Sequence, residues 1–146
     1  MTVIRTAVPE DAPQLLDLWA MLFDEDGPWR ANAQEWFART ADDPGTARFP
    51  VIEVDGVIVA TAIGTLELGV PNPHCPRGRT VRLANVVTHP AHRGRGYGTA
   101  LVGDVVDWAR SINADRVDLS ATPEGEPIYA KTGFVRTSAP RMKLTL

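Results

Sequence analysis

Cysteine is almost absent from this sequence, because Cys75 is the only one among 146 residues. A lone cysteine excludes a disulfide within the chain and a zinc site built from several thiolates, so we expect a reducing, cytoplasmic location. Long apolar runs are absent as well. No stretch approaches the about 20 residues that a membrane helix needs, and the first residues lack a secretory signal. We therefore expect no membrane partner.

An excess of positive charge is also missing, since the formal net charge is −3 and the pI is about 5.6. We therefore expect no nucleic-acid partner. Hydrophobic residues make up 44% and charged residues 23%, which is typical of a globular chain with a core. The length predicts a single domain, residues 1–146. Basic residues nevertheless gather around one predicted strand, and we expect them to help hold a polyanionic cofactor: Arg77, Arg79, Arg82, His92, Arg93 and Arg95.

Hydrophobic periodicity predicts alternating helices and strands. The expected elements are a strand at 2–5, helices around 15–22 and 33–39, a hairpin of 50–54 and 57–63, a strand at 80–88, a helix at 97–112, a strand at 116–121, a helix at 126–132 and a strand region at 134–146.

The hairpin prediction rests on Asp55-Gly56, a dipeptide typical of two-residue turns. The strand, helix and strand between 80 and 121 form one crossover unit, whose strands should be parallel. The sheet is therefore expected to be mixed. An eightfold βα barrel and a doubly wound dinucleotide fold both need more crossovers than this chain contains.

A glycine cluster, His92-Arg93-Gly94-Arg95-Gly96-Tyr97-Gly98-Thr99, separates the central strand from the most amphipathic helix. Alternate glycines allow backbone N–H groups to gather around an anion at a helix N-terminus. This pattern is typical of phosphate binding. A P-loop would need GxxxxGK[ST], and a dinucleotide fingerprint would need GxGxxG, whereas the spacing here is GxGxG.

The pattern Arg93-x-x-Gly96-x-Gly98 matches the [Q/R]xxGx[G/A] signature, and NVVTHPAHRGRGYGTALV (85–102) resembles the acetyl-CoA loop of the GCN5-related N-acetyltransferase (GNAT) superfamily. PIYAKTGF (127–134) resembles the second signature of that family. The resemblance implies an α/β fold of the α+β type: a mixed, mostly antiparallel central sheet with helices on both faces. It also implies an acetyl-CoA-dependent N-acetyltransferase that needs no metal.

The same resemblance implies a set of cofactor-binding residues. Backbone amides of the glycine loop would hold the pyrophosphate of coenzyme A. The pantetheine arm would pair with the end of the central strand, and the N–H of Val87 would polarise the thioester. Many members have an asparagine where this chain has Thr122, which leaves that contact open. The expected residues are Val86, Val87, Thr88, Arg93, Gly94, Arg95, Gly96, Tyr97, Gly98, Thr99 and Thr122.

Two catalytic residues are expected. Tyr129 aligns with the family's general acid, and a phenol with a pKa of about 10 is matched to a departing thiolate. Glu67 is the best-placed candidate for the general base, and a solvated residue at a strand end is an equal alternative. Glu53 and His89 are the next candidates, although a capping role is more common for a histidine at a strand end.

The acceptor is expected to be the amine of a small molecule or peptide. Trp29 and Trp36, with the acidic residues at 24–26, lie in the region that forms the family's acceptor pocket, and core anchoring is an equal alternative. Adjacent His74 and Cys75 indicate neither a thiol nucleophile nor a metal site. Homodimers are common in the family. A non-catalytic acyl-CoA-binding module, another acyl group and a hydroxyl acceptor remain as alternatives.

Overall fold

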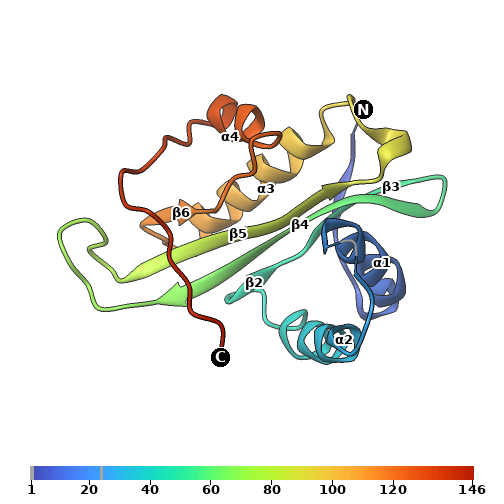
Figure 1. Cartoon of the computed structure of the whole chain (residues 1–146), viewed down its shortest axis with the longest axis horizontal. Coiled ribbons are helices and arrows are strands. Elements are labelled where there is room, and N and C mark those ends of the chain that lie inside the picture. The colour runs from blue at the N-terminus through green and yellow to red at the C-terminus, as the bar shows by residue number, and fades with distance from the viewer. Residues whose placement is uncertain (1, 24) are drawn as a thin grey trace.

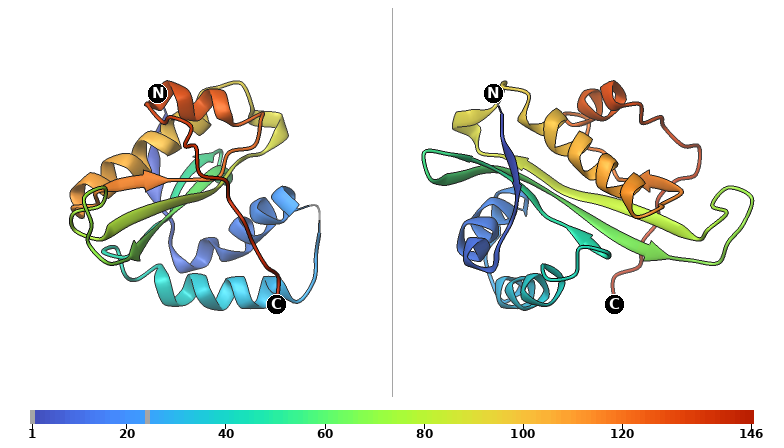
Figure 2. Two further views of the ribbon diagram at one scale, coloured as in Figure 1. Left: turned by 60° about the vertical axis from the view of Figure 1, so that its left-hand side comes forward. Right: turned by 180° about the vertical axis from the view of Figure 1, so that it is seen from behind.

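The computed structural model describes residues 2–23 and 25–146. A central sheet separates two helical layers, with α1 and α2 on one face and α3 and α4 on the other (Figures 1 and 2). This arrangement confirms the expected fold class. The elements in chain order are β1 (Ile4–Thr6), the 3-10 turn η1 (Pro9–Asp11), α1 (Ala12–Phe23), α2 (Trp29–Thr40), β2 (Ala47–Arg48), β3 (Pro50–Val54), β4 (Val57–Leu68), β5 (Arg79–Thr88), η2 (Pro90–His92), α3 (Tyr97–Ser111), β6 (Arg116–Asp118) and α4 (Glu126–Thr132).

β3 and β4 form the predicted hairpin. Asp55 and Gly56 take φ values of 50° and 79°, and two positive φ values are what a type I′ turn requires. β4 pairs antiparallel with both β3 and β5, whereas β5 pairs in parallel with β6. The predicted crossover through α3 is therefore confirmed, and the strand order is β1-β3-β4-β5-β6 with β2 beside β4.

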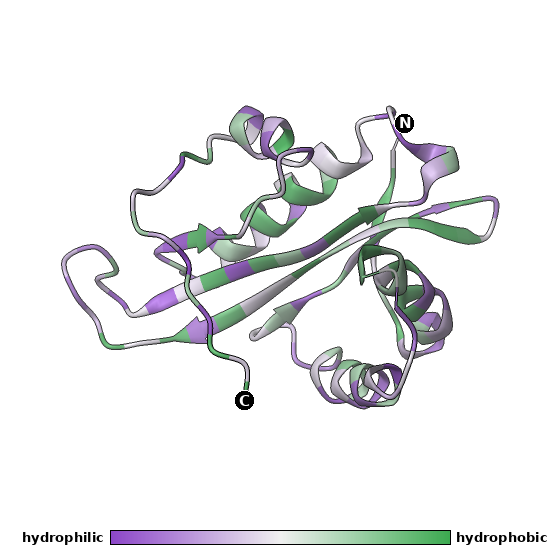
Figure 3. Cartoon of the chain, in the orientation of Figure 1, coloured by the Kyte–Doolittle hydropathy of each residue, from purple (hydrophilic) through white to green (hydrophobic). Residues whose placement is uncertain are grey.

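Each face of the sheet has its own hydrophobic cluster (Figure 3). On one face, Leu15, Trp19 and Phe37 of α1 and α2 pack against strand residues that include Val51. On the other face, the apolar stripe of α3, which includes Val105, packs against Val81 and Leu83 of β5. The helices thus cover the middle of the sheet, and loops lie at the two ends of β5.

The C-terminal segment 134–146 is not the strand that its sequence predicts. Met142, Leu144 and Leu146 alternate as in a strand, but all three side chains are exposed. A strand depends on hydrogen bonds to a neighbour, and this segment pairs with none of the described strands. It instead runs away from β6 toward the side of the sheet that carries α1 and α2 (Figures 1 and 2).

The other differences concern boundaries. β6 ends at Asp118 rather than at 121, because β5 and β6 stop pairing there. α2 begins at Trp29 rather than near 33, and the two-residue strand β2 was not predicted. No helix among residues 2–23 and 25–146 is long and apolar enough to cross a membrane.

Candidate functional site

The loop between β5 and α3 contains the glycines that the sequence assigns to phosphate binding. Gly94 and Gly96 both have φ of 80°, a conformation that residues with side chains rarely adopt. A Cβ at either position would meet no atom within 4 Å, so the missing side chains leave open space against the backbone. This loop therefore fits a ligand that lies directly on the main chain.

The N-terminus of α3 follows the loop at once, because Gly96 is its N-cap and Tyr97 its first residue. N–H groups in the first turn of a helix lack acceptors within the helix, and the helix dipole is positive there. Arg93 Nε donates a hydrogen bond of 3.2 Å to the carbonyl of Thr88, which ties the loop to β5. Arg95 is exposed. Backbone amides and a mobile guanidinium together fit a diphosphate group.

β5 and β6 stop pairing partway along β5. Their last pair is Arg82–Asp118, and within the described residues Leu83 to Thr88 have no strand partner on the β6 side. The expected pantetheine positions Val86, Val87 and Thr88 all lie in this stretch. Backbone groups of this stretch that bond neither to β4 nor, like the carbonyl of Thr88, to Arg93 can pair with an extended ligand in the manner of an added strand.

A β-bulge lies in the same stretch of β5. Thr61 pairs with Val87 and Ile63 with Ala84, so β5 carries one residue more than β4 between these pairs. Asn85 takes a φ of 49° there. Sequence reasoning missed this bulge, although asparagine is among the few residues that tolerate positive φ. The bulge bends β5 a few residues beyond its last pair with β6.

Tyr129 lies on α4, partly buried in the cluster on the α3 face. Burial raises the pKa of its phenol above the ordinary value, so the group keeps its proton at neutral pH. A Cβ on Gly125 would lie 3.2 Å from Tyr129 Cε2, so this glycine allows close packing against the ring. Thr122 Oγ1 accepts a hydrogen bond of 3.2 Å from the Gly125 N–H, which gives this side chain a role in the turn before α4.

The candidate bases occupy three different places. Glu67 is exposed near the end of β4 and lies opposite Thr80 of β5. Glu53 accepts a hydrogen bond of 2.9 Å from Arg5, at the other side of the sheet. His89 Nδ1 accepts from the Ala91 N–H at 3.2 Å, the capping role named as its alternative. None of these contacts brings a carboxylate to Tyr129, so the base stays a prediction.

The basic cluster read from the sequence is not one patch. Arg79 and Arg93 lie at opposite ends of β5, because the strand separates them. Arg79 donates to the carbonyl of Ile112, at 2.8 Å for its shorter contact. Asp115 accepts from Cys75 Sγ at 3.2 Å, so Cys75 helps anchor the loop before β5. Only the residues after β5 are placed to meet a ligand on the glycine loop.

The tryptophans expected near the acceptor pack with other aromatic residues. Trp36 lies 5.4 Å from Phe49 between ring centroids, and Trp29 lies 6.0 Å from Phe23. Asp24, expected in the same region, is outside the described residues. The core-anchoring alternative therefore accounts for both rings.

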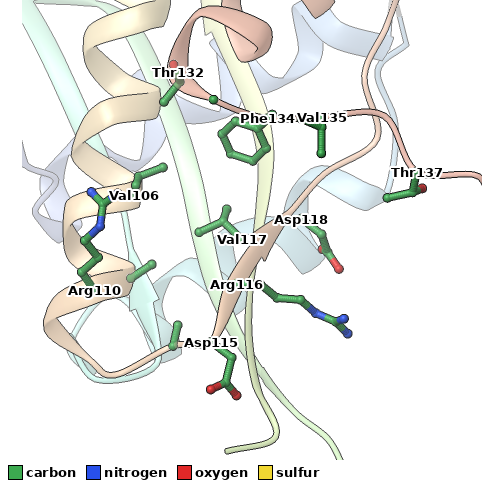
Figure 4. Close-up of a pocket in the computed structure, with 13 residues that line it drawn as sticks. Val106, Arg110, Asp115, Arg116, Val117, Asp118, Thr132, Phe134, Val135 and Thr137 are labelled. Carbon is green, nitrogen blue, oxygen red and sulfur yellow. The ribbon is translucent and has the colours of Figure 1, made fainter. Parts of the chain in front are cut away.

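Two hollows of about 550 and 580 Å³ lie along the outer edge of β6. Val117 points from β6 toward Val106 and Phe134 in the first hollow, while Arg116 and Asp118 point to the other side (Figure 4). Tyr129 lines the second hollow. Within the described ranges, no group of three His, Cys, Asp or Glu residues could hold a metal ion.

Comparisons with known proteins identify the family and the fold of this chain. The family model described as "Acetyltransferase (GNAT) family" matches residues 12–134. A glucosamine 6-phosphate N-acetyltransferase from Trypanosoma brucei brucei is 33% identical over 85 residues, 58% of this chain and 57% of that protein. A glucosamine 6-phosphate N-acetyltransferase from Oryza sativa is 41% identical over 58 residues, 40% of this chain and 35% of that protein. The chain thus spans about half or less of these relatives.

A solved structure shows the same fold over nearly the full chain. The crystal structure of a predicted acetyltransferase with acetyl-CoA from Clostridium acetobutylicum has a TM-score of 0.88 and 24% sequence identity. The similarity covers 99% of this chain and 96% of that chain.

Proposed function

The chain belongs to the acetyltransferase (GNAT) family, and from this premise we propose that it transfers an acetyl group from acetyl-CoA to an amine. The observation that carries the proposal is the glycine loop with positive φ at Gly94 and Gly96, next to a stretch of β5 that has no partner on the β6 side among the described residues. A diphosphate would lie on backbone amides 93–99, and an extended arm would follow Val86, Val87 and Thr88. We further propose that the described residues form one transferase domain.

The proposed reaction is direct transfer with both substrates bound. The thioester supplies an acyl carbon open to attack by a neutral amine. Because a lysine-like amine has a pKa of about 10.4, a base must take its proton. Glu67 is the expected base, but it lies six residues along β4 from Thr61, the partner of Val87, which is about 20 Å at the rise of a strand. Glu67 is therefore too distant to take the proton directly or through one water, and the proton would pass to solvent water.

A backbone N–H of β5 on the side toward β6 would donate to the thioester oxygen. Val87 does not fit this role, because its N–H faces Thr61 of β4. Tyr129 would give its proton to the sulfur as the C–N bond forms and the C–S bond breaks.

Isothermal titration with acetyl-CoA and with coenzyme A tests the binding step. We expect Gly96→Ala to weaken binding by about tenfold, because the new Cβ enters the space proposed for the ligand. The alanine must also keep the left-handed conformation of Gly96 in the binding-competent loop, which costs about 1–2 kcal/mol. Gly103→Ala is the matched control on α3, since its Cβ would meet no atom within 4 Å and its φ is not positive. No binding by the wild-type protein would contradict the proposal.

Thiol release with a panel of amines tests the transfer step. The panel includes glucosamine and glucosamine 6-phosphate, because two relatives are named as N-acetyltransferases of glucosamine 6-phosphate. Propylamine and 3-aminopropanoate extend it to simpler amines. Binding of acetyl-CoA without thiol release for any amine would instead favour a non-catalytic acyl-CoA-binding module.

A further inference from the structure

Two arginines converge on one hydroxyl beside the last pair of β5 and β6. Ser120 Oγ accepts a hydrogen bond of 2.7 Å from Arg141 Nη1 and one of 3.3 Å from Arg82 Nη2. Arg82 comes from β5, Ser120 follows β6, and Arg141 comes from the C-terminal segment. Parts of the chain that are distant in sequence thus bring two full positive charges to a neutral oxygen.

The acidic groups nearby compensate these charges only in part. Asp118 Oδ1 lies 3.5 Å from Arg82 Nη1, a long contact, and 46% of the Asp118 side chain is exposed. Glu67 lies on the neighbouring strand opposite Thr80, and Arg116 Nε donates to the hydroxyl of that threonine. These contacts involve three arginines and two carboxylates. A further carboxylate, Asp115, lies near Thr80 through Cys75, and it accepts from the backbone N–H groups of Arg77 and Arg79.

This cluster lies next to the stretch of β5 that has no partner on the β6 side. Arg82 and Asp118 form the last pair before β5 and β6 separate. Arg82 lies between Val81 and Leu83, which pack toward α3, so its side chain extends from the opposite face of the sheet. Asp118 also points away from the α3 side (Figure 4). An acceptor bound on this face, beside the unpaired stretch of β5, would lie close to the two guanidinium groups.

We propose that Arg82, Arg141 and Ser120 form a subsite for an anionic group, a carboxylate or a phosphate, carried by the amine acceptor. This inference rests on the proposed function. Guanidinium groups bind such anions through paired N–H donors. An anionic oxygen can replace the Ser120 hydroxyl as the acceptor of the hydrogen bonds from both arginines. The Ser120 hydroxyl can then donate a hydrogen bond to the same anion. The acceptor is thus an anionic or zwitterionic amine, not a polyamine.

Matched acceptor pairs test the subsite. One pair is glucosamine and glucosamine 6-phosphate, and the other is propylamine and 3-aminopropanoate, so each pair differs by one anionic group. We expect the wild-type kcat/KM to be at least about tenfold higher for the anionic member of one pair. The pair that shows the preference identifies phosphate or carboxylate as the bound group.

Arg141→Gln tests the subsite without disturbing the fold, because Arg141 is exposed on the C-terminal segment. We expect this variant and Arg82→Gln to bring the kcat/KM ratio within a pair toward one through a higher KM for the anionic member. Arg110→Gln on α3 is the charge-matched control and should keep the ratio. Turnover with a wild-type ratio near one, or equal losses for both members in the variants, would overturn this inference alone. No turnover with any amine would overturn the proposed transfer as well.

Discussion

Tyr129 is the residue whose chemistry the proposed reaction depends on most. Replacing it with phenylalanine removes the phenolic proton and keeps the ring that packs 6.0 Å from Phe134 between centroids. We expect kcat to fall by about a hundredfold with little change in the KM for acetyl-CoA, because general acid catalysis contributes at least about that much. Steady-state thiol release measures both constants.

A second hydroxyl on the same helix supplies the control for this experiment. Thr132 Oγ1 donates to the carbonyl of Ile128 at 3.3 Å, so Thr132→Val removes a hydroxyl from α4 without touching Tyr129. We expect its kcat to match the wild type. The raised pKa of Tyr129 keeps the phenol protonated at neutral pH, so the acid contribution should disappear only as the pH rises through that raised pKa. An unchanged rate in Tyr129→Phe would remove Tyr129 from the acid role.

Functional residues that belong to one local motif can be predicted from the sequence. Contacts between residues that are distant in the sequence cannot be predicted in this way. Gly94 and Gly96 follow from their spacing because left-handed conformations and close backbone approach select glycine locally. The convergence of Arg82 and Arg141 on Ser120 joins three segments, and no spacing in the sequence indicates it. Side-chain partners of this kind depend on tertiary placement.

At the scale of elements, Gly64 determines how closely α3 packs on β4. A Cβ there would lie 2.8 Å from Val105 Cγ1 and 3.1 Å from Trp108 Cζ3, and Val105 is fully buried. We therefore expect Gly64→Ala to lower the free energy of unfolding by about 2 kcal/mol, the usual cost of overpacking a core. Urea denaturation measures the change.

The Gly64 prediction has a direct test of its cause. Combining Gly64→Ala with Val105→Ala removes the methyl group that the new Cβ would meet, so the double variant should lose less stability than the sum of the single variants. Additive losses would show that the close contact is not responsible. Gly103→Ala should leave stability equal or higher, because its Cβ enters open space within a helix.

Elements with a strong local signal matched their predictions most closely. The Asp55-Gly56 turn and α4 lie where the sequence predicts them, since turn geometry and a C-cap at Gly133, with φ of 108°, are local properties. The segment 134–146 has the alternation of a strand but no partner among the described strands. Strand formation depends on pairing, which periodicity alone does not reveal.

At the scale of the whole molecule, the net charge of −3 does not show where the positive charges lie. Arg93 and Arg95 border the glycine loop, while Arg82 and Arg141 lie beside the last pair of β5 and β6. Positive charge thus lies at both ends of the unpaired stretch of β5, in keeping with the two anionic substrates that we propose. A mildly acidic protein can therefore present a basic site.

A buried carboxylate makes the stability of the whole molecule depend on pH. Asp11 accepts hydrogen bonds from Arg5 at 2.7 and 3.0 Å and from the Val8 N–H at 2.8 Å, and it joins the start of α1 to β1. The hydrogen bonds from Arg5 lower the pKa of Asp11 below its ordinary value of about 3.9, although burial opposes this shift. The stabilisation is therefore complete above about pH 5 and is lost as the pH falls through the lowered pKa.

Asp11→Asn keeps the shape of this side chain and removes its charge. We expect the variant to be less stable than the wild type by about 1–2 kcal/mol at pH 7, because the charge-assisted hydrogen bonds are lost. The loss is no larger because the partner Arg5 is partly exposed, and solvent weakens its interaction with Asp11. The difference should shrink as the pH falls below about 4, since the wild-type carboxyl then becomes protonated too. Urea denaturation between pH 7 and pH 2 measures this convergence, with the exposed neighbour Glu10→Gln as the control. A stability difference that stays constant with pH would show that packing, and not the charge of Asp11, supports the junction of α1 and β1.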